Sequence, residues 1–162
     1  MHHLKRREEI VLAPEYEGSS DGFERAALVD GSTGSVHMGL GLAALEDGHV
    51  ETHVHSFEES FFVLEGTPTL YLDGRGVTLL PGACGVVPVG VPHAWRAEDG
   101  RATWIDMAAP QPRVPGQGQP DTFFHGGIPT SPSSPLARHA CGTPTGTTPH
   151  APGSSWKPRP SR

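Results

Sequence analysis

Three histidines and one glutamate give the clearest chemical signal in this chain. His53 and His55 are separated by one residue, and Glu59 follows four positions after His55. A third histidine, His93, lies forty residues after His53. Three imidazoles and a carboxylate form a mixed nitrogen and oxygen donor set that suits a divalent transition metal. The alternative is that these polar residues lie on the solvent side of a surface strand.

The local sequence predicts how these side chains meet. Residues 49–55 read as a β-strand, in which alternate side chains share a face. His53 and His55 therefore point the same way, about 7 Å apart, and can converge on one ion with metal–nitrogen bonds of about 2.1 Å. The apolar run 60–64 follows Glu59. If that run folds back beside the first strand, Glu59 faces the two histidines.

A second motif surrounds the third histidine. Residues 82–93 follow the pattern G-x5-P-x-G-x2-H, which ends at His93. The first segment follows H-x-H-x3-E-x6-G and ends at Gly66, with fifteen residues between it and Gly82. Together these patterns, within residues 34–107, resemble the paired motifs of the cupin family. Two positions depart from the family pattern: Gly48 stands five rather than six residues before His53, and Ala97 replaces a frequent asparagine.

The resemblance implies a fold and a site. The expected fold is all-β, a cupin double-stranded β-helix or jelly-roll barrel, with His53, His55, Glu59 and His93 as ligands of a metal in its interior. Four such ligands leave two positions open on an octahedral ion. Manganese, iron or nickel suits this donor set best, and zinc or copper is compatible with it.

Cupins include dioxygenases, isomerases, decarboxylases and hydrolases, so we expect a metalloenzyme that acts on a small polar or aromatic molecule. The reaction types expected first are those of a dioxygenase and of a hydrolase similar to the bicupin ureidoglycine aminohydrolase. The alternatives are a non-catalytic ligand-binding or sensor cupin, and a truncated or frame-shifted bicupin with reduced activity.

Four further residues are candidates for the pocket. Glu51 has the same strand parity as the histidines and is the candidate acid or base near the metal. His37, Tyr71 and Trp95 are candidates for the pocket wall. For each of them, ordinary packing or surface exposure is the competing interpretation.

Glycine, proline and acidic residues recur at short intervals and separate the apolar segments. This spacing predicts many short strands and no long helix. Residues 46–48 read as a turn between two strands, and Asp73 to Gly76 as a hairpin turn. The strands are expected at residues 8–12, 23–30, 35–45, 49–55, 60–64, 69–73, 77–80, 85–87, 93–97 and 102–107, with a short strand or anchor at 121–124.

Composition divides the chain near Pro110. Residues 1–109 carry seven Lys/Arg and seventeen Asp/Glu, a net charge of −10, and form the expected barrel domain. Residues 110–162 have a net charge of +4 and hold twelve of the seventeen prolines. Such a segment buries too little apolar surface to offset its ordering entropy. We therefore expect residues 110–162 to form a mostly disordered tail, with disorder from about residue 127 onward and with His125, His139 and His150 as solvated bystanders.

Charge and cysteine usage limit the partners. An acidic barrel domain argues against nucleic acid, and no apolar run is long enough to span a membrane. The chain has two cysteines, Cys84 in the second motif and Cys141 in the tail, which suggest no disulfide framework and a reduced, cytoplasmic setting. No secretory signal is recognised at the start. A small molecule is the expected partner, and edge-strand pairing makes a homodimer the expected assembly.

Overall fold

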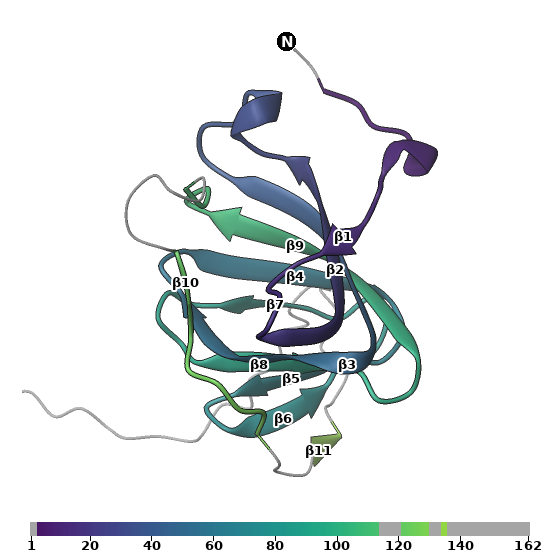
Figure 1. The fold of residues 1–162 in the computed structure, drawn as a ribbon, viewed down its shortest axis with the longest axis vertical. Coiled ribbons are helices and arrows are strands. Elements are labelled where there is room, and N and C mark those ends of the chain that lie inside the picture. The colour runs from purple at the N-terminus through teal and green to yellow at the C-terminus, as the bar shows by residue number, and fades with distance from the viewer. Residues whose placement is uncertain (1–2, 114–120, 130–133, 136–162) are drawn as a thin grey trace, which may run out of the picture.

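One curled sheet makes up most of the molecule (Figure 1). The computed structural model describes residues 3–113, 121–129 and 134–135. Two short 3-10 helices, η1 (Arg7–Glu9) and η2 (Gly31–Thr33), lie near the N-terminus. The strands are β1 (Ala13–Pro14), β2 (Ser20–Val29), β3 (Gly39–His55), β4 (Glu58–Glu65), β5 (Thr69–Leu72), β6 (Arg75–Thr78), β7 (Cys84–Val87), β8 (His93–Arg96), β9 (Arg101–Ala109), β10 (Thr122–Phe124) and β11 (Ser134–Pro135).

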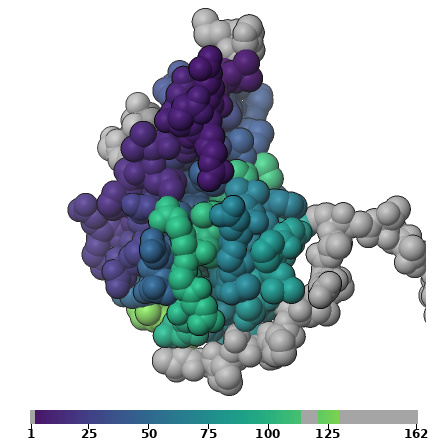
Figure 2. Space-filling view, turned by 90° about the vertical axis from the view of Figure 1, so that its right-hand side faces the viewer, coloured from purple at the N-terminus to yellow at the C-terminus, as the bar shows by residue number. Residues whose placement is uncertain are grey.

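The hydrogen-bonded strands follow the order β11-β6-β5-β8-β3-β9-β4-β7, and the sheet curls over on itself. In Figure 1, β9 and β4 lie above β3, β8, β5 and β6, and the core lies between these layers. β2 pairs with β3 outside that main order. The N-terminal segment extends beyond the barrel on one side (Figures 1 and 2). The all-β jelly-roll expectation is confirmed.

β3 is the strand that organises the barrel, because it has neighbours along both halves. Its first half pairs with β9 from Gly39 to Glu46, and its second half pairs with β8 from His49 to His53. The predicted turn at residues 46–48 is wrong, since the strand bends there and continues. Asp47 has a φ of 43°, and a side chain at Gly48 would collide with the carbonyl of Asp21 on β2. β3 pairs with β2 on either side of this bend, across a register shift between Asp21 and Phe23, and so stays one strand.

The β5–β6 hairpin follows its sequence signal. Leu72 pairs with Arg75, so the loop consists of Asp73 and Gly74 alone. Both residues have positive φ, 49° and 75°, as the two-residue turn that Asp-Gly favours requires. The predicted hairpin is confirmed, with β5 ending one residue earlier than expected and β6 beginning and ending two residues earlier, so that the turn has two residues rather than four.

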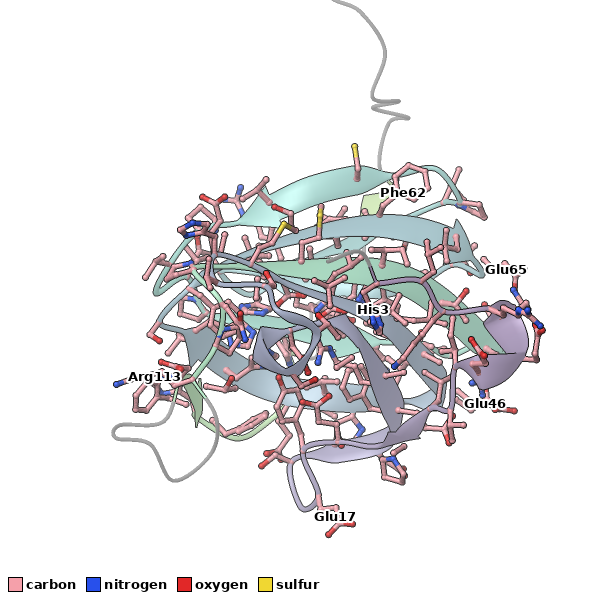
Figure 3. The ribbon with its side chains drawn as sticks, turned by 90° about the horizontal axis from the view of Figure 1, so that it is seen from above. His3, Glu17, Glu46, Phe62, Glu65 and Arg113 are labelled. Carbon is pink, nitrogen blue, oxygen red and sulfur yellow. The ribbon has the colours of Figure 1, made fainter. Side chains whose placement is uncertain are left out.

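The aromatic core lies at the centre of the barrel. Trp104 on β9 is 1% exposed and stacks on Trp95 of β8 with ring centroids 4.6 Å apart. Phe61 of β4 meets Trp95 edge to face at 5.2 Å, and Phe23 of β2 packs on Trp104 at 6.1 Å. Rings from four strands therefore hold the layers together. The opposite face of β4 is turned outward, as Phe62 shows in Figure 3.

Two further sequence expectations are corrected. Residues 8–12 do not form a strand, because η1 and an extended segment occupy this region and the first strand is Ala13–Pro14. The expected strand 35–45 begins only at Gly39; the small residues Gly39, Gly41 and Ala43 are buried there, whereas Leu40 and Leu42 are half-buried. The other predicted strands are present within a few residues of their expected limits.

The region after the barrel is described only in part. The predicted short strand is confirmed as β10, which pairs with β3. Disorder was expected from about residue 127, yet the Gly127 carbonyl accepts hydrogen bonds from the Thr52 amide and hydroxyl. His125 is exposed, as expected. His139 and His150, with most of the predicted tail, lie outside the described residues.

Cys84 is part of a disulfide bond in the structure, so the expectation that it is reduced is wrong. Disulfides are rare in the cytosol, and the cysteine argument for a cytoplasmic location therefore loses its support. None of the helices in the described part of the chain has the length and apolar character needed to cross a bilayer.

Candidate metal centre

The structure brings His53, His55, Glu59 and His93 together inside the barrel. One potential ligand atom from each lies within 4.8 Å of those of the others. All four side chains are buried, although histidine and glutamate normally seek solvent. The sequence-based grouping of these residues is thus reproduced by the fold.

Three strands deliver the four side chains. His53 and His55 project from β3 with one residue between them, as strand alternation predicts. His93 opens β8 directly opposite His53 in the antiparallel pair. Glu59 belongs to β4, which faces β3 across the barrel interior and pairs with β7 and β9. Adjacent and opposing strands therefore converge on a single point.

The glutamate lies between two of the imidazoles. Its Oε2 is 3.0 Å from Nε2 of His55 and 3.3 Å from Nε2 of His93. Burial by itself raises the pKa of Glu59, but hydrogen bonds to His55 and His93 and the charge of these rings outweigh it and hold the pKa below its ordinary value. Glu59 is therefore an anion at neutral pH.

The far side of each imidazole ring is held by a neighbour. Nδ1 of His53 donates to the Glu51 carbonyl at 2.7 Å, and Nδ1 of His93 donates to the Val91 carbonyl at 2.9 Å. Nδ1 of His55 is 3.0 Å from the Thr122 hydroxyl on β10. Such contacts fix the ring orientation and the tautomer of metal-binding histidines.

This arrangement fits a cation. With Nδ1 carrying the proton, Nε2 of a neutral His93 presents a lone pair to the Glu59 carboxylate, which is also an acceptor. Two facing acceptors repel each other unless a proton or a metal ion lies between them. Burial, followed by the influence of His93, lowers the pKa of His53 to about 3, so this ring is a neutral nitrogen donor. The donor set and its orientation therefore suit a divalent metal.

Three of these residues, His53, His55 and Glu59, form part of the wall of a cavity of about 810 Å³. This volume lies within the range of small-molecule sites. Its apolar lining consists mainly of rings: Tyr16, Phe23, Phe57, Trp95, Trp104 and Phe124. Its polar lining includes Glu15, Arg25 and Asp106. The metal centre thus opens onto a largely aromatic chamber with a separate group of charged residues.

The other predicted pocket residues have different outcomes. Trp95 lines the cavity and is also a core residue. Tyr71 is buried but does not line the cavity, and His37 is exposed. Glu51 is absent from the cavity lining, because an irregularity between Val50 and His53 shifts the strand parity. Its carbonyl, rather than its carboxylate, contacts the site.

Sequence reasoning missed several residues at the site. Tyr16 comes from a turn with a φ of 62°, and its ring lies 6.0 Å from that of His53 and 5.1 Å from that of Phe124. Arg25 and Asp106 are 81 positions apart and read as ordinary strand residues. Only the pairing of their strands with β3 brings them to the cavity.

Comparisons with known proteins agree with this geometry. A family model for the cupin domain matches residues 42–107. The polyketide cyclase RemF from Streptomyces resistomycificus is similar in structure, with a TM-score of 0.64 and 23% identity over 68% of this chain and 81% of that chain. An RmlC-like cupin from Shewanella frigidimarina gives a TM-score of 0.56 and 21% identity over 68% of this chain and 92% of that chain. Residues 42–107 are therefore a cupin domain, and the chain has the fold of these cupins.

A longer cupin is also similar. A variant of the oxalate decarboxylase OxdC from Bacillus subtilis gives a TM-score of 0.58 and 16% identity. The match covers 73% of this chain but only 31% of that one. At these identities the likeness establishes the fold alone. A comparison with curated protein sequences finds no match. The expected family is confirmed, and the buried cluster of this cupin could hold a metal.

Proposed function

We propose that this cupin is a metal-dependent enzyme that acts on a small aromatic molecule carrying oxygen groups. The observation that carries the proposal is the convergence of one ligand atom from each of four buried residues, His53, His55, Glu59 and His93, all within 4.8 Å of one another. A divalent cation at this point would be held by three imidazole nitrogens and one carboxylate oxygen.

The chemistry would be divided between the ion and the cavity. A bound divalent ion, with manganese, iron or nickel preferred and zinc or copper compatible, supplies a Lewis acid with open coordination positions. The Glu51 and Val91 carbonyls and the Thr122 hydroxyl hold the three rings in place. The aromatic walls bind the flat faces of a ligand and exclude water.

The size and lining of the cavity favour an aromatic or polyketide-like ligand. A chamber of about 810 Å³ is far larger than a two-carbon acid such as oxalate requires. Rings dominate its apolar lining, and offset or edge-to-face contacts with them stabilise a flat ligand. The name of the polyketide cyclase among the similar structures points the same way. A dioxygenase and a ureidoglycine aminohydrolase-like hydrolase stay as alternative reaction types for the same site.

The test combines metal analysis with turnover. Protein purified without added salts is analysed for bound metal and then incubated with catechols, polyhydroxylated naphthalenes, keto acids and ureido compounds. We expect one equivalent of metal and conversion of an aromatic compound. Oxygen uptake identifies a dioxygenase, and ammonia release identifies a ureido hydrolase. Tight ligand binding without turnover of any compound would instead assign the protein to the sensor cupins.

Two other expectations continue as proposals. Glu51 stays the candidate acid or base from the sequence, and normal turnover by Glu51→Gln would remove it from the mechanism. A homodimer is proposed because Phe62, Leu64 and Val86 are 41–50% exposed on the outer faces of β4 and β7. Light scattering at micromolar concentration measures its mass, and a monomer would contradict this proposal.

A further inference from the structure

A half-buried ion pair lines the cavity that also holds metal-site residues. Arg25 on β2 and Asp106 on β9 belong to strands that pair with β3 on opposite sides of it. Nε of Arg25 donates to Oδ2 of Asp106 at 2.8 Å, and the side chains are 20% and 14% exposed. The pair therefore lies over the inner face of β3, within the same cavity as the metal ligands.

Gly41 creates the space for this ion pair. It stands opposite Asp106 in the β3–β9 pair and opposite Ala27 in the β2–β3 pair. A Cβ at this position would collide with Oδ1 of Asp106 and with the guanidinium of Arg25. The φ of Gly41 is not in the left-handed region, so the close approach of these side chains, and not backbone strain, requires the glycine.

The hydrogen bonds of this pair are incomplete. Among the described residues, Oδ1 of Asp106 is buried and has no hydrogen-bond partner. Within the same residues, Nε is the one guanidinium nitrogen of Arg25 that makes a hydrogen bond. Nη1 lies 3.8 Å from Glu15, which is an ion-pair distance but too long for a hydrogen bond. The pair therefore offers both free donors and a free acceptor. Buried groups of this kind normally have partners.

We propose that Arg25 and Asp106 together bind a hydroxyl group of the ligand. A hydroxyl group accepts a hydrogen bond from the Arg25 guanidinium and donates one to Oδ1 of Asp106, so it satisfies the free groups of both side chains. A carboxylate could satisfy Arg25 but not Oδ1, and it would meet the charges of Asp106 and Glu15. A methoxy group lacks the proton that Oδ1 needs. This inference rests on the proposed function and names the ligand class as a phenol or enol whose hydroxyl is remote from its metal-binding oxygens.

The test uses probes that differ at one position. The parent is 2,3-dihydroxynaphthalene, whose adjacent hydroxyls can chelate the metal. Its 6-hydroxy, 6-methoxy and 6-carboxy derivatives change only the distal group. Binding to the metal-loaded protein is followed by quenching of Trp95 and Trp104, which line the cavity. We expect the 6-hydroxy compound to bind about tenfold more tightly than the parent or the methoxy compound, since its hydroxyl bonds charged groups.

Two variants locate the effect. Asp106→Asn removes the anionic acceptor, and Gly41→Ala places a methyl group against Oδ1 without changing any charge. In each, the preference for the 6-hydroxy compound should fall to about twofold or less, while the parent binds as before. Gly39→Ala is the matched control, because its methyl group would make ordinary contacts, 3.5 Å from Pro112 and 3.8 Å from Ala108. It should retain the preference.

The outcomes separate this inference from the proposed function. If the metal-loaded protein does not bind the parent compound, the aromatic ligand proposal itself fails. If the parent binds but the 6-hydroxy group adds no affinity, or both variants keep the preference, the role of Arg25 and Asp106 is refuted. Circular dichroism confirms that the variants fold. If neither variant folds, the affinities of the four probes for the unaltered protein still decide whether the distal hydroxyl group is recognised.

Discussion

The Thr122 hydroxyl is the contact through which the metal centre can be perturbed without touching a ligand. Two of the three imidazoles are oriented by backbone carbonyls, which a substitution cannot remove. The third, His55, is oriented by Thr122 Oγ1 at 3.0 Å. Thr122→Val keeps the size and branching of the side chain and removes the hydroxyl. We predict that this change weakens metal binding while leaving all four ligands in place.

The magnitude follows from the environment of His55. Its side chain is 4% exposed, so Nδ1 loses its partner and gains little water in exchange. Leaving such a buried polar group unpaired costs about 1–3 kcal/mol. Residues that orient metal-binding histidines contribute about 10- to 100-fold to affinity, or roughly 1.4–2.7 kcal/mol. We therefore expect Thr122→Val to bind the metal at least about tenfold more weakly.

Chelator competition with Mn²⁺ or Zn²⁺ measures this loss. Thr122→Ser restores the hydroxyl and should bind within about threefold of the unaltered protein. Thr69→Val is a second control, because it removes a partly buried hydroxyl that pairs with Thr78 away from the site. If Thr122→Val binds the metal as tightly as the Ser variant does, Thr122 does not orient His55, and the account of how the rings are held is wrong.

Three further predictions concern the same region. His93→Ala should abolish stoichiometric metal binding, whereas Glu59→Gln should weaken it less because a carbonyl oxygen remains; metal analysis after dialysis distinguishes them, and a fully loaded His93→Ala would exclude this residue as a ligand. At a free metal concentration about 100 times Kd, the bound ion should add about 2.7 kcal/mol to the free energy of unfolding. Its removal should therefore lower the melting temperature by several degrees, and an unchanged melting curve would contradict tight binding to the folded state. Hydrogen bonds from Arg113 and then from Ser56 hold the pKa of Asp121 below its ordinary value, so this contact stabilises β10 above about pH 4 and is lost as the pH falls through the lowered value. The protection of the His125 amide, which bonds Thr52, is measured relative to its intrinsic exchange rate at each pH; it should therefore fall in acid, and it should be lower in Arg113→Met than in the unaltered protein already at neutral pH.

Short strands were predictable from local spacing, and the barrel and the ligand set from the resemblance of two motifs to those of the cupin family. The interval between His53 and His55 places both on one face of any regular strand. Glycines and acidic residues mark the ends of most other strands, and the β5–β6 hairpin was predicted from the four residues Asp73 to Gly76. The bend at Asp47 was misread as a turn, since local sequence cannot show that β2 continues its pairing on either side.

The position of Glu51 shows the same limit. Perfect alternation places it with the histidines, but the irregularity between Val50 and His53 moves its side chain away from the cavity. A strand irregularity of this kind depends on the partner strand β8, which lies forty residues away in sequence. The burial of Gly41 on β3 likewise depends on other strands, because Arg25 of β2 and Asp106 of β9 occupy the space over it.

The amino-acid sequence by itself indicated an all-β fold and the shared face of His53 and His55, because these follow from residue type and short-range spacing, and the resemblance of its two motifs to those of cupins indicated the barrel and the four residues that can hold a metal. Tertiary structure alone decided what surrounds them: the carbonyls and the hydroxyl that orient the rings, the aromatic chamber, and the meeting of Arg25 with Asp106. These contacts join strands that are distant in the chain, and their formation depends on the register and bending of the whole sheet.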